Sequence, residues 1–89
     1  MIQSTSMAVR FTRHAREKFD ILAEHKFVVT EAQIIDTVNS PDIVETDRDL
    51  SIAQKGFDEK HVLRVVFRVE NDDKVIITFY PGRRRQYEN

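Results

Sequence analysis

The first third of the chain carries apolar residues at the spacing of α-helices. Between positions 12 and 26, four of them recur every three or four residues and would share one helical face: Ala15, Phe19, Leu22 and Ala23. Thr12 precedes this stripe, and its hydroxyl can accept a hydrogen bond from a backbone N–H of the first turn. We therefore predict that Thr12 is the N-cap of this helix.

A second helix has the clearest start signal in the chain. Thr30 and Gln33 stand three residues apart, which is the spacing of a capping box, where each side chain bonds the backbone N–H of the other residue. The apolar stripe that follows consists of Ile34, Ile35 and Val38. We expect the helix to end at positions 39–41, because the residue before Pro41 avoids helical geometry.

After Pro41 the apolar positions change to a period of two, which is typical of strands. The pattern predicts four strands, over residues 42–46, 50–57, 61–69 and 75–80. The polar residues 71–73 predict a tight turn between the last two strands. Such short connections join antiparallel neighbours, so these strands should form a meander.

The last two strands would present two different faces. One face is apolar and consists of Leu63, Val65, Phe67, Val69, Val75, Ile77 and Phe79. The other face mixes apolar, basic and hydroxyl side chains: Val62, Arg64, Val66, Arg68, Ile76, Thr78 and Tyr80. If the helices cover the apolar face, the arginines and the tyrosine lie on an open surface.

The grouping of helices before strands indicates an α+β fold. We expect two N-terminal helices packed on one face of a three- to four-stranded antiparallel sheet. The 89 residues suffice for one modest core, so we predict a flexible leader over residues 1–8 and a single domain over residues 9–89. There is no cysteine to form a disulfide. Stability must therefore come from packing, which formation of a homodimer would assist.

The charges of the chain are nearly balanced but unevenly distributed. Residues 31–49 hold six acids against one arginine, so this stretch carries −5 and the remainder +4, for a net charge of −1. Indiscriminate nucleic-acid binding goes with a strongly basic domain, which this is not. No apolar run approaches the roughly 20 residues of a membrane span, and no signal peptide is evident. We expect a cytoplasmic protein with no membrane partner.

One charged cluster stands out at the end of the chain. Arg83, Arg84 and Arg85 follow a Pro-Gly pair and lie between Tyr80 and Tyr87. Guanidinium groups fork onto phosphates, and tyrosine rings stack on bases. The cluster predicts RNA or another phosphate-bearing partner. An acidic protein segment would satisfy it too, whether it belongs to an antitoxin or to a second copy of this chain.

Four segments resemble a bacterial and archaeal family of small domains of unknown function, which is recognised by a His-Ala pair at the start of the first helix. These segments are Phe11–Phe19, Asn39–Asp42, His61–Val66 and Thr78–Pro81 with the following arginines. The resemblance extends from Val9 to Tyr87. That family is itself distantly similar to the RelE/ParE toxin superfamily, including BrnT-type toxins. Many members of the superfamily cleave mRNA on the ribosome until an antitoxin inactivates them, whereas ParE-type members poison gyrase.

The resemblance implies a toxin-like endoribonuclease of a toxin–antitoxin pair. The expected catalytic residues are His14, Arg64, Arg83 and Tyr87. The expected contacts to RNA are Lys55, Arg68, Tyr80, Arg84 and Arg85. We expect no metal and no cofactor, because the 2′-hydroxyl of RNA serves as the nucleophile and the three histidines have no convergent spacing. The near-neutral charge departs from that of ribosome-directed members, which are usually strongly basic.

Each candidate residue also has a purely structural interpretation. His14 could bond a backbone carbonyl and fix its helix, and His25 suits a helix end, where positive charge is favourable. His61 fits a role in orientation or partner contact. Arg64 and Arg68 could form ion pairs on a solvated strand face. A non-catalytic protein-binding domain of the same fold is therefore the alternative function.

Overall fold

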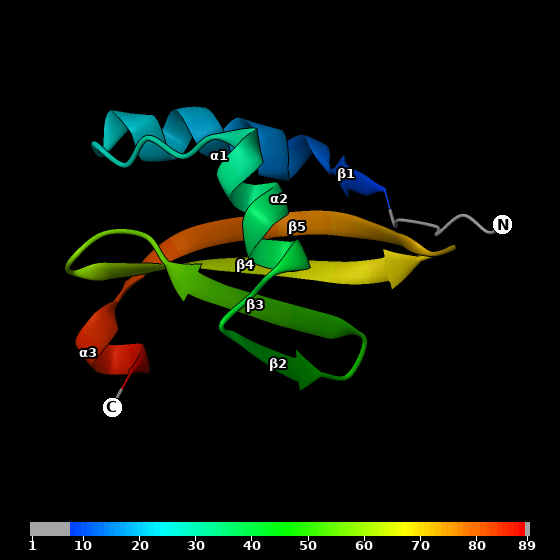
Figure 1. Ribbon diagram of the computed structural model, residues 1–89. Coiled ribbons are helices and arrows are strands. Elements are labelled where there is room, and N and C mark those ends of the chain that lie inside the picture. The colour runs from blue at the N-terminus through cyan, green and yellow to red at the C-terminus, as the bar shows by residue number, and fades with distance from the viewer. Residues whose placement is uncertain (1–7, 89) are drawn as a thin grey trace, which may run out of the picture.

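Two helices cover one face of a five-stranded sheet in the computed structural model, which describes residues 8–88 (Figure 1). In chain order the elements are β1 (Val9–Phe11), α1 (Arg13–Glu24), α2 (Glu31–Asn39), β2 (Ile43–Asp47), β3 (Leu50–Gly56), β4 (His61–Glu70), β5 (Asp73–Arg83) and α3 (Arg84–Tyr87). The strand order is β1-β5-β4-β3-β2. The predicted α+β class is thereby confirmed, while the leader expected at residues 1–8 lies, apart from Ala8, outside the described residues.

Both helices begin where the capping signals predicted. The Thr12 hydroxyl accepts a hydrogen bond from the Ala15 N–H at 3.1 Å. Thr30 and Gln33 form the reciprocal capping box, with the Gln33 N–H 3.1 Å from the Thr30 hydroxyl and the Thr30 N–H 2.9 Å from the side-chain Oε1 of Gln33. These bonds satisfy backbone donors that would otherwise lack partners in the first helical turn. Helix α2 ends at Asn39, as the proline at position 41 predicted.

The core lies between the helices and the sheet. It consists of Ala15, Leu22, Val29, Ile34, Val38, Ala53, Leu63, Val65, Phe67, Ile76 and Phe79, with Phe11, Phe19, Phe27 and Phe57 packed against it. Five residues expected in apolar stripes lie outside this core. Ala23 and Val69 are exposed, Ile35 is 36% exposed, Ile77 is partly buried, and Val75 is buried but pairs with Arg68 instead of with a core residue. The helices pack on one side only, so the edges of each stripe remain in contact with water.

A β-bulge in the last hairpin changes which residues of β5 reach the core. Thr78 pairs with Val66 and Ile76 pairs with Phe67, so Ile77 has no partner on β4. One extra residue reverses the alternation, so the side chains that precede it in β5 lie on the face opposite to the predicted one. Ile76 is therefore fully buried in the core, and the prediction that it shares a face with Thr78 and Tyr80 was wrong.

The sheet also differs from the predicted antiparallel one. Strand β1 pairs in parallel with β5, with Val9 beside Lys74 and Phe11 beside Ile76. The other three pairings are antiparallel. With three residues β1 is too short for alternation to be recognisable, and its partner lies more than sixty residues further along the chain. Helix α3 was also not predicted.

The bulge can be tested by truncating two adjacent side chains. We expect Ile76→Ala to lower the free energy of unfolding by about 2–5 kcal/mol, because it empties a fully buried position. Ile77→Ala should cost clearly less, since Ile77 is only partly buried. Urea unfolding of both variants measures the difference. An equal or reversed ranking would contradict the position of the bulge.

Candidate nucleic-acid interface

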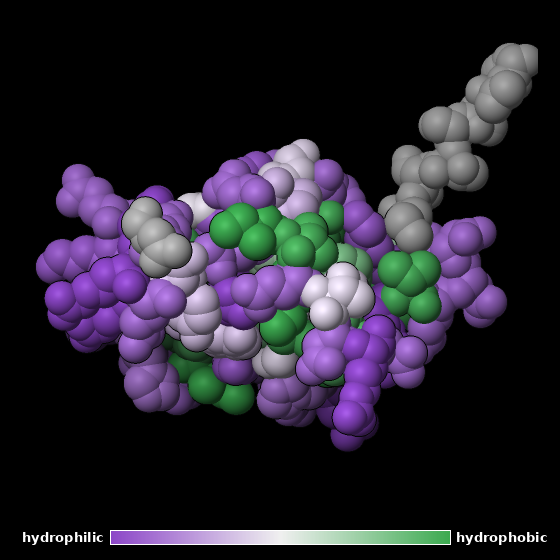
Figure 2. Space-filling model, turned by 90° about the horizontal axis from the view of Figure 1, so that it is seen from below, coloured by the Kyte–Doolittle hydropathy of each residue, from purple (hydrophilic) through white to green (hydrophobic). Residues whose placement is uncertain are grey.

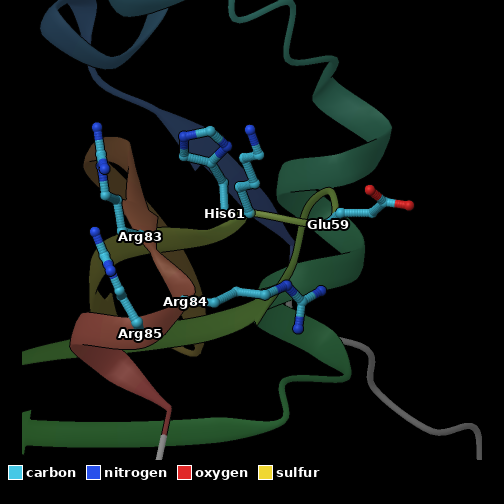
Figure 3. Close-up of a pocket in the computed structure, with 6 residues that line it drawn as sticks. Glu59, His61, Arg83, Arg84 and Arg85 are labelled. Atoms are coloured by element: carbon cyan, nitrogen blue, oxygen red, sulfur yellow. The ribbon is translucent and has the colours of Figure 1, made fainter.

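A hollow of about 610 Å³ lies where β4 begins and β5 ends (Figure 3). Its lining consists of Glu59, Lys60, His61, Arg83, Arg84 and Arg85. These residues come from the β3–β4 loop, the ends of two strands and α3. His61 and Arg83 are direct partners in the antiparallel pairing, so their side chains project from the same face of the sheet. Four of the six lining residues carry a positive charge and one carries a negative charge, so the local charge favours an anion over a cation.

The three arginines do not play equivalent parts in this hollow. The Nε of Arg84 donates to the Asp58 carbonyl oxygen at 2.8 Å, and its Nη1 donates to both carboxylate oxygens of Glu88 at 3.1 Å. Arg84 therefore fastens α3 to the β3–β4 loop. Arg83 and Arg85 are exposed, and within residues 8–88 neither side chain forms a hydrogen bond or an ion pair. Figure 3 shows both guanidinium groups directed to the side on which the His61 ring lies.

His61 is held in place by Asp58. Its Nδ1 lies 2.9 Å and 3.1 Å from the two carboxylate oxygens of Asp58. The same carboxylate accepts the backbone N–H groups of Lys60 and His61, each at 2.8 Å. The edge-on ring of Phe27, 4.9 Å from the imidazole centroid, limits rotation from the other side. The side chain of His61 remains 23% exposed and can be reached from the hollow.

Asp58 is suited to orient the imidazole because it stays ionised. Partial burial raises the pKa of Asp58, but hydrogen bonds from the Lys60 and His61 N–H groups and from the His61 ring outweigh it and hold the pKa below the usual aspartate range. An ionised carboxylate can only accept hydrogen bonds, so Nδ1 of His61 carries a proton. In the neutral ring, the lone pair is then on Nε2.

A second basic centre, formed around Arg64, lies on the sheet face opposite the helices. Arg64 is only 5% exposed. It donates to the Tyr80 hydroxyl at 3.1 Å, to the side-chain Oε1 of Gln54 at 2.5 Å and to the Glu45 carboxylate at 3.1 Å. Burial lowers the pKa of Arg64, but the bonds to Tyr80 and Glu45 outweigh it and leave the pKa raised. Arg64 is thus a charged residue whose donors already have partners.

The ring of Tyr87 covers this buried arginine. Its centroid lies 4.1 Å from the guanidinium carbon of Arg64, at cation–π distance. The ring approaches the sheet at Gly82, where a Cβ atom would collide with it. Figure 2, which views this face, shows apolar and hydrophilic residues interspersed over the strands, with hydrophilic residues crowded at the end opposite the N-terminus.

The structure divides the residues that the sequence assigned to one site. Arg83, Arg84 and Arg85 line the hollow. Arg64, Tyr80 and Tyr87 form the centre on the open face.

The other predicted residues lie elsewhere. Lys55 pairs with the core residue Leu63 and so belongs to the helix-covered face, where its amine contacts the Asp36 carboxylate at 2.7 Å. Arg68 forms an ion pair with Glu70 of its own strand. His14 is exposed on α1, in the helical layer.

Sequence reasoning missed Asp58 and Lys60. The available signal was an aspartate three residues before the first residue of a strand, a spacing at which its carboxylate can accept backbone N–H groups. The sequence predicts a role in orientation or partner contact for His61, because its ring shares a strand face with Leu63. Its position beside Arg83 depends on a strand pairing that the sequence does not specify. His25 lies at the end of α1, with Nδ1 3.0 Å from the Ile21 carbonyl oxygen.

Comparison with known proteins gives no family assignment: no protein-family model matches the chain, and searches of curated proteins and of solved structures found no significant match. Within residues 8–88 no three histidine, aspartate or glutamate side chains are grouped so that they could hold a metal ion. None of the helices in this part of the chain is long and apolar enough to cross a membrane.

The packing of Tyr87 can be tested at Gly82. We expect Gly82→Ala to displace the Tyr87 ring from Arg64, because the added methyl group would occupy its position. The measurement is the NMR shift of the Arg64 Nε–H, which the ring current of Tyr87 perturbs. Gly56→Ala is the matched control, since its Cβ would meet only the end of the flexible Arg84 side chain at 2.7 Å. An unchanged Arg64 signal in Gly82→Ala would refute the contact.

The lowered pKa of Asp58 predicts a specific pH dependence. A carboxyl group with a pKa below its unfolded value stabilises the fold above that value, and the contribution disappears as the pH falls through the folded pKa. We expect the wild type to be more stable than Asp58→Asn at neutral pH, with the gap closing below about pH 4. Denaturant titrations across this range measure it. A gap that stays constant down to pH 2 would contradict the assignment.

Proposed function

We propose that this chain is a toxin-like endoribonuclease that binds the phosphate backbone of RNA in the hollow at the end of the sheet. The observation that carries this proposal is the pair Arg83 and Arg85, two exposed guanidinium groups with no partner among the described residues, beside the Asp58-oriented His61. An exposed charged side chain that has no counterion within the protein is suited to bind an oppositely charged group of a ligand.

Phosphate is the ligand that this chemistry favours. A guanidinium group offers a planar fork of N–H donors that matches two phosphate oxygens, and Lys60 adds a point charge at the rim of the same hollow. The volume is sufficient for a nucleotide unit rather than for a single small ion. Because the whole chain has a net charge of −1, long-range attraction of RNA should be weak, and binding should depend on a few local contacts.

The hollow is also the surface to which the proposed antitoxin would bind. An acidic segment of a partner protein would neutralise Arg83 and Arg85 and compete with RNA for the hollow. As a ribonuclease directed at mRNA, the protein would act in the cytoplasm. The resemblance to a family that is distantly similar to the RelE/ParE superfamily supports this proposal, as do the two exposed arginines.

The proposal is tested by binding of a labelled single-stranded oligoribonucleotide. We expect Arg83→Gln combined with Arg85→Gln to weaken binding by about tenfold or more, because two charge-assisted contacts to phosphate are lost. Arg13→Gln is the matched control, since Arg13 is exposed on α1 and forms no ion pair among the described residues. Fluorescence anisotropy at several salt concentrations should also give a shallower salt dependence for the double variant.

Induced expression in a bacterial host tests the activity. Growth arrest with fragmented mRNA, both lost in the double arginine variant, is the expected result. Arrest with intact RNA would point instead to a protein target. Failure of the wild-type protein to bind RNA, together with normal growth, would favour the non-catalytic protein-binding domain.

A further inference from the structure

We propose that His61 is the proton-transferring catalytic residue of this site and that Asp58 is its positioning residue. The inference rests on the proposed function, because it assumes that RNA phosphate occupies the hollow. It assigns the chemistry to a histidine at the start of β4, whereas the sequence pointed to His14 on α1.

The arrangement around His61 is that of an oriented general base. Nδ1 bonds the Asp58 carboxylate at 2.9 Å and 3.1 Å, and Phe27 restricts the ring from one side. Nε2 forms no hydrogen bond within residues 8–88, so it is the nitrogen left for a substrate. A reactive side chain held by a second group, which is fixed in turn by a third, is the general design of activated sites. Here the backbone N–H groups of Lys60 and His61 fix the carboxylate.

The charges that surround the imidazole suit phosphoryl chemistry. The nearby acids, Asp58 and Glu59, belong to the β3–β4 loop. The nearby basic residues are Lys60, Arg83, Arg84 and Arg85. The connection between α1 and α2 contributes Phe27, which is uncharged. Arg84 is occupied by Glu88 and the Asp58 carbonyl oxygen. The cations left for a ligand are therefore Lys60, Arg83 and Arg85. These stabilise the negative charge that accumulates on phosphorus-bound oxygens in the transition state.

The reaction that follows is an intramolecular phosphoryl transfer. Neutral His61 takes the proton of the 2′-hydroxyl at Nε2, and the 2′-oxygen forms a bond to the adjacent phosphorus. The bond between phosphorus and the 5′-oxygen breaks, and the departing oxygen takes a proton from water. The products are a 2′,3′-cyclic phosphate and a 5′-hydroxyl end, and His61 then returns its proton to the solvent. The step needs no oxidant, reductant or further reactant.

His14 lacks each of these features. It is exposed on α1, and within residues 8–88 no side-chain hydrogen bond orients its ring. It also belongs to none of the residues that line the hollow. His25 bonds the Ile21 carbonyl oxygen at the end of the same helix and is likewise outside the hollow. Of the three histidines, His61 is the one that is both oriented by a carboxylate and placed beside free arginines.

The experiment follows cleavage of a labelled single-stranded oligoribonucleotide and its binding under the same conditions. We expect His61→Gln to reduce the cleavage rate by about a hundredfold or more, the usual contribution of general acid–base catalysis, while the Kd changes by no more than about threefold. His25→Gln is the matched histidine control and should cleave as the wild type does. The wild-type product should carry a 2′,3′-cyclic phosphate, which mass spectrometry identifies. A different product end would overturn the proposed step.

Two further measurements separate catalysis from a structural role. Free imidazole should restore part of the cleavage by His61→Ala, which a purely structural histidine would not permit. Asp58→Asn should lower kcat for cleavage while leaving the Kd for RNA unchanged, which is the split expected of a positioning residue. Equal thermal unfolding of His61→Gln and wild type would exclude loss of the fold as the cause.

The outcomes distinguish this inference from the function on which it rests. Wild-type cleavage that persists in His61→Gln, or is lost in His14→Gln instead, would overturn the assignment while leaving the endoribonuclease proposal intact. Wild-type protein that binds RNA through Arg83 and Arg85 without cleaving it would overturn the catalytic role and retain the binding site. Absence of RNA binding by the wild type would show that the proposed function itself has failed.

Discussion

The buried guanidinium of Arg64 links its own strand to four other elements of the fold. It bonds Glu45 of β2, Gln54 of β3 and Tyr80 of β5, and it lies beneath Tyr87 of α3. Burying a charge is costly unless hydrogen bonds and a counterion offset the loss of water. All of these partners must therefore be in place when Arg64 is buried. This requirement favours a single register of four strands and one position of the last helix. The open face of the sheet is specified largely by this requirement.

The sequence predicted what depends on neighbouring residues and missed what depends on distant ones. The caps at Thr12 and Thr30 and the alternation in β4 are local signals, so both helices and four strands lie close to their predicted bounds. The parallel pairing of β1 with β5 joins segments from opposite ends of the chain. The bulge at Ile77 depends on how two strands pair, and no residue type in the sequence indicates it. The resulting error in the core was therefore confined to β5.

The candidate site was predictable in composition but not in geometry. Three consecutive arginines were visible as a cluster, yet only the structure separates Arg84, which fastens α3, from the free Arg83 and Arg85. Lys55 and Arg64 fall on opposite faces because their strands pair with Lys55 beside Leu63. That register is set by the hairpin and by packing, so spacing along the chain could not reveal it.

Helix α3 has only four residues, yet it touches both sides of the sheet end. Arg85 lines the hollow, while Tyr87 rests on Arg64 across the sheet. Within so short a segment one residue cannot be repositioned without moving the other. A ligand that held Arg85 in place would therefore also favour the contact of Tyr87 with Arg64, and a partner that displaced Tyr87 from Gly82 would weaken the binding of that ligand by the same factor.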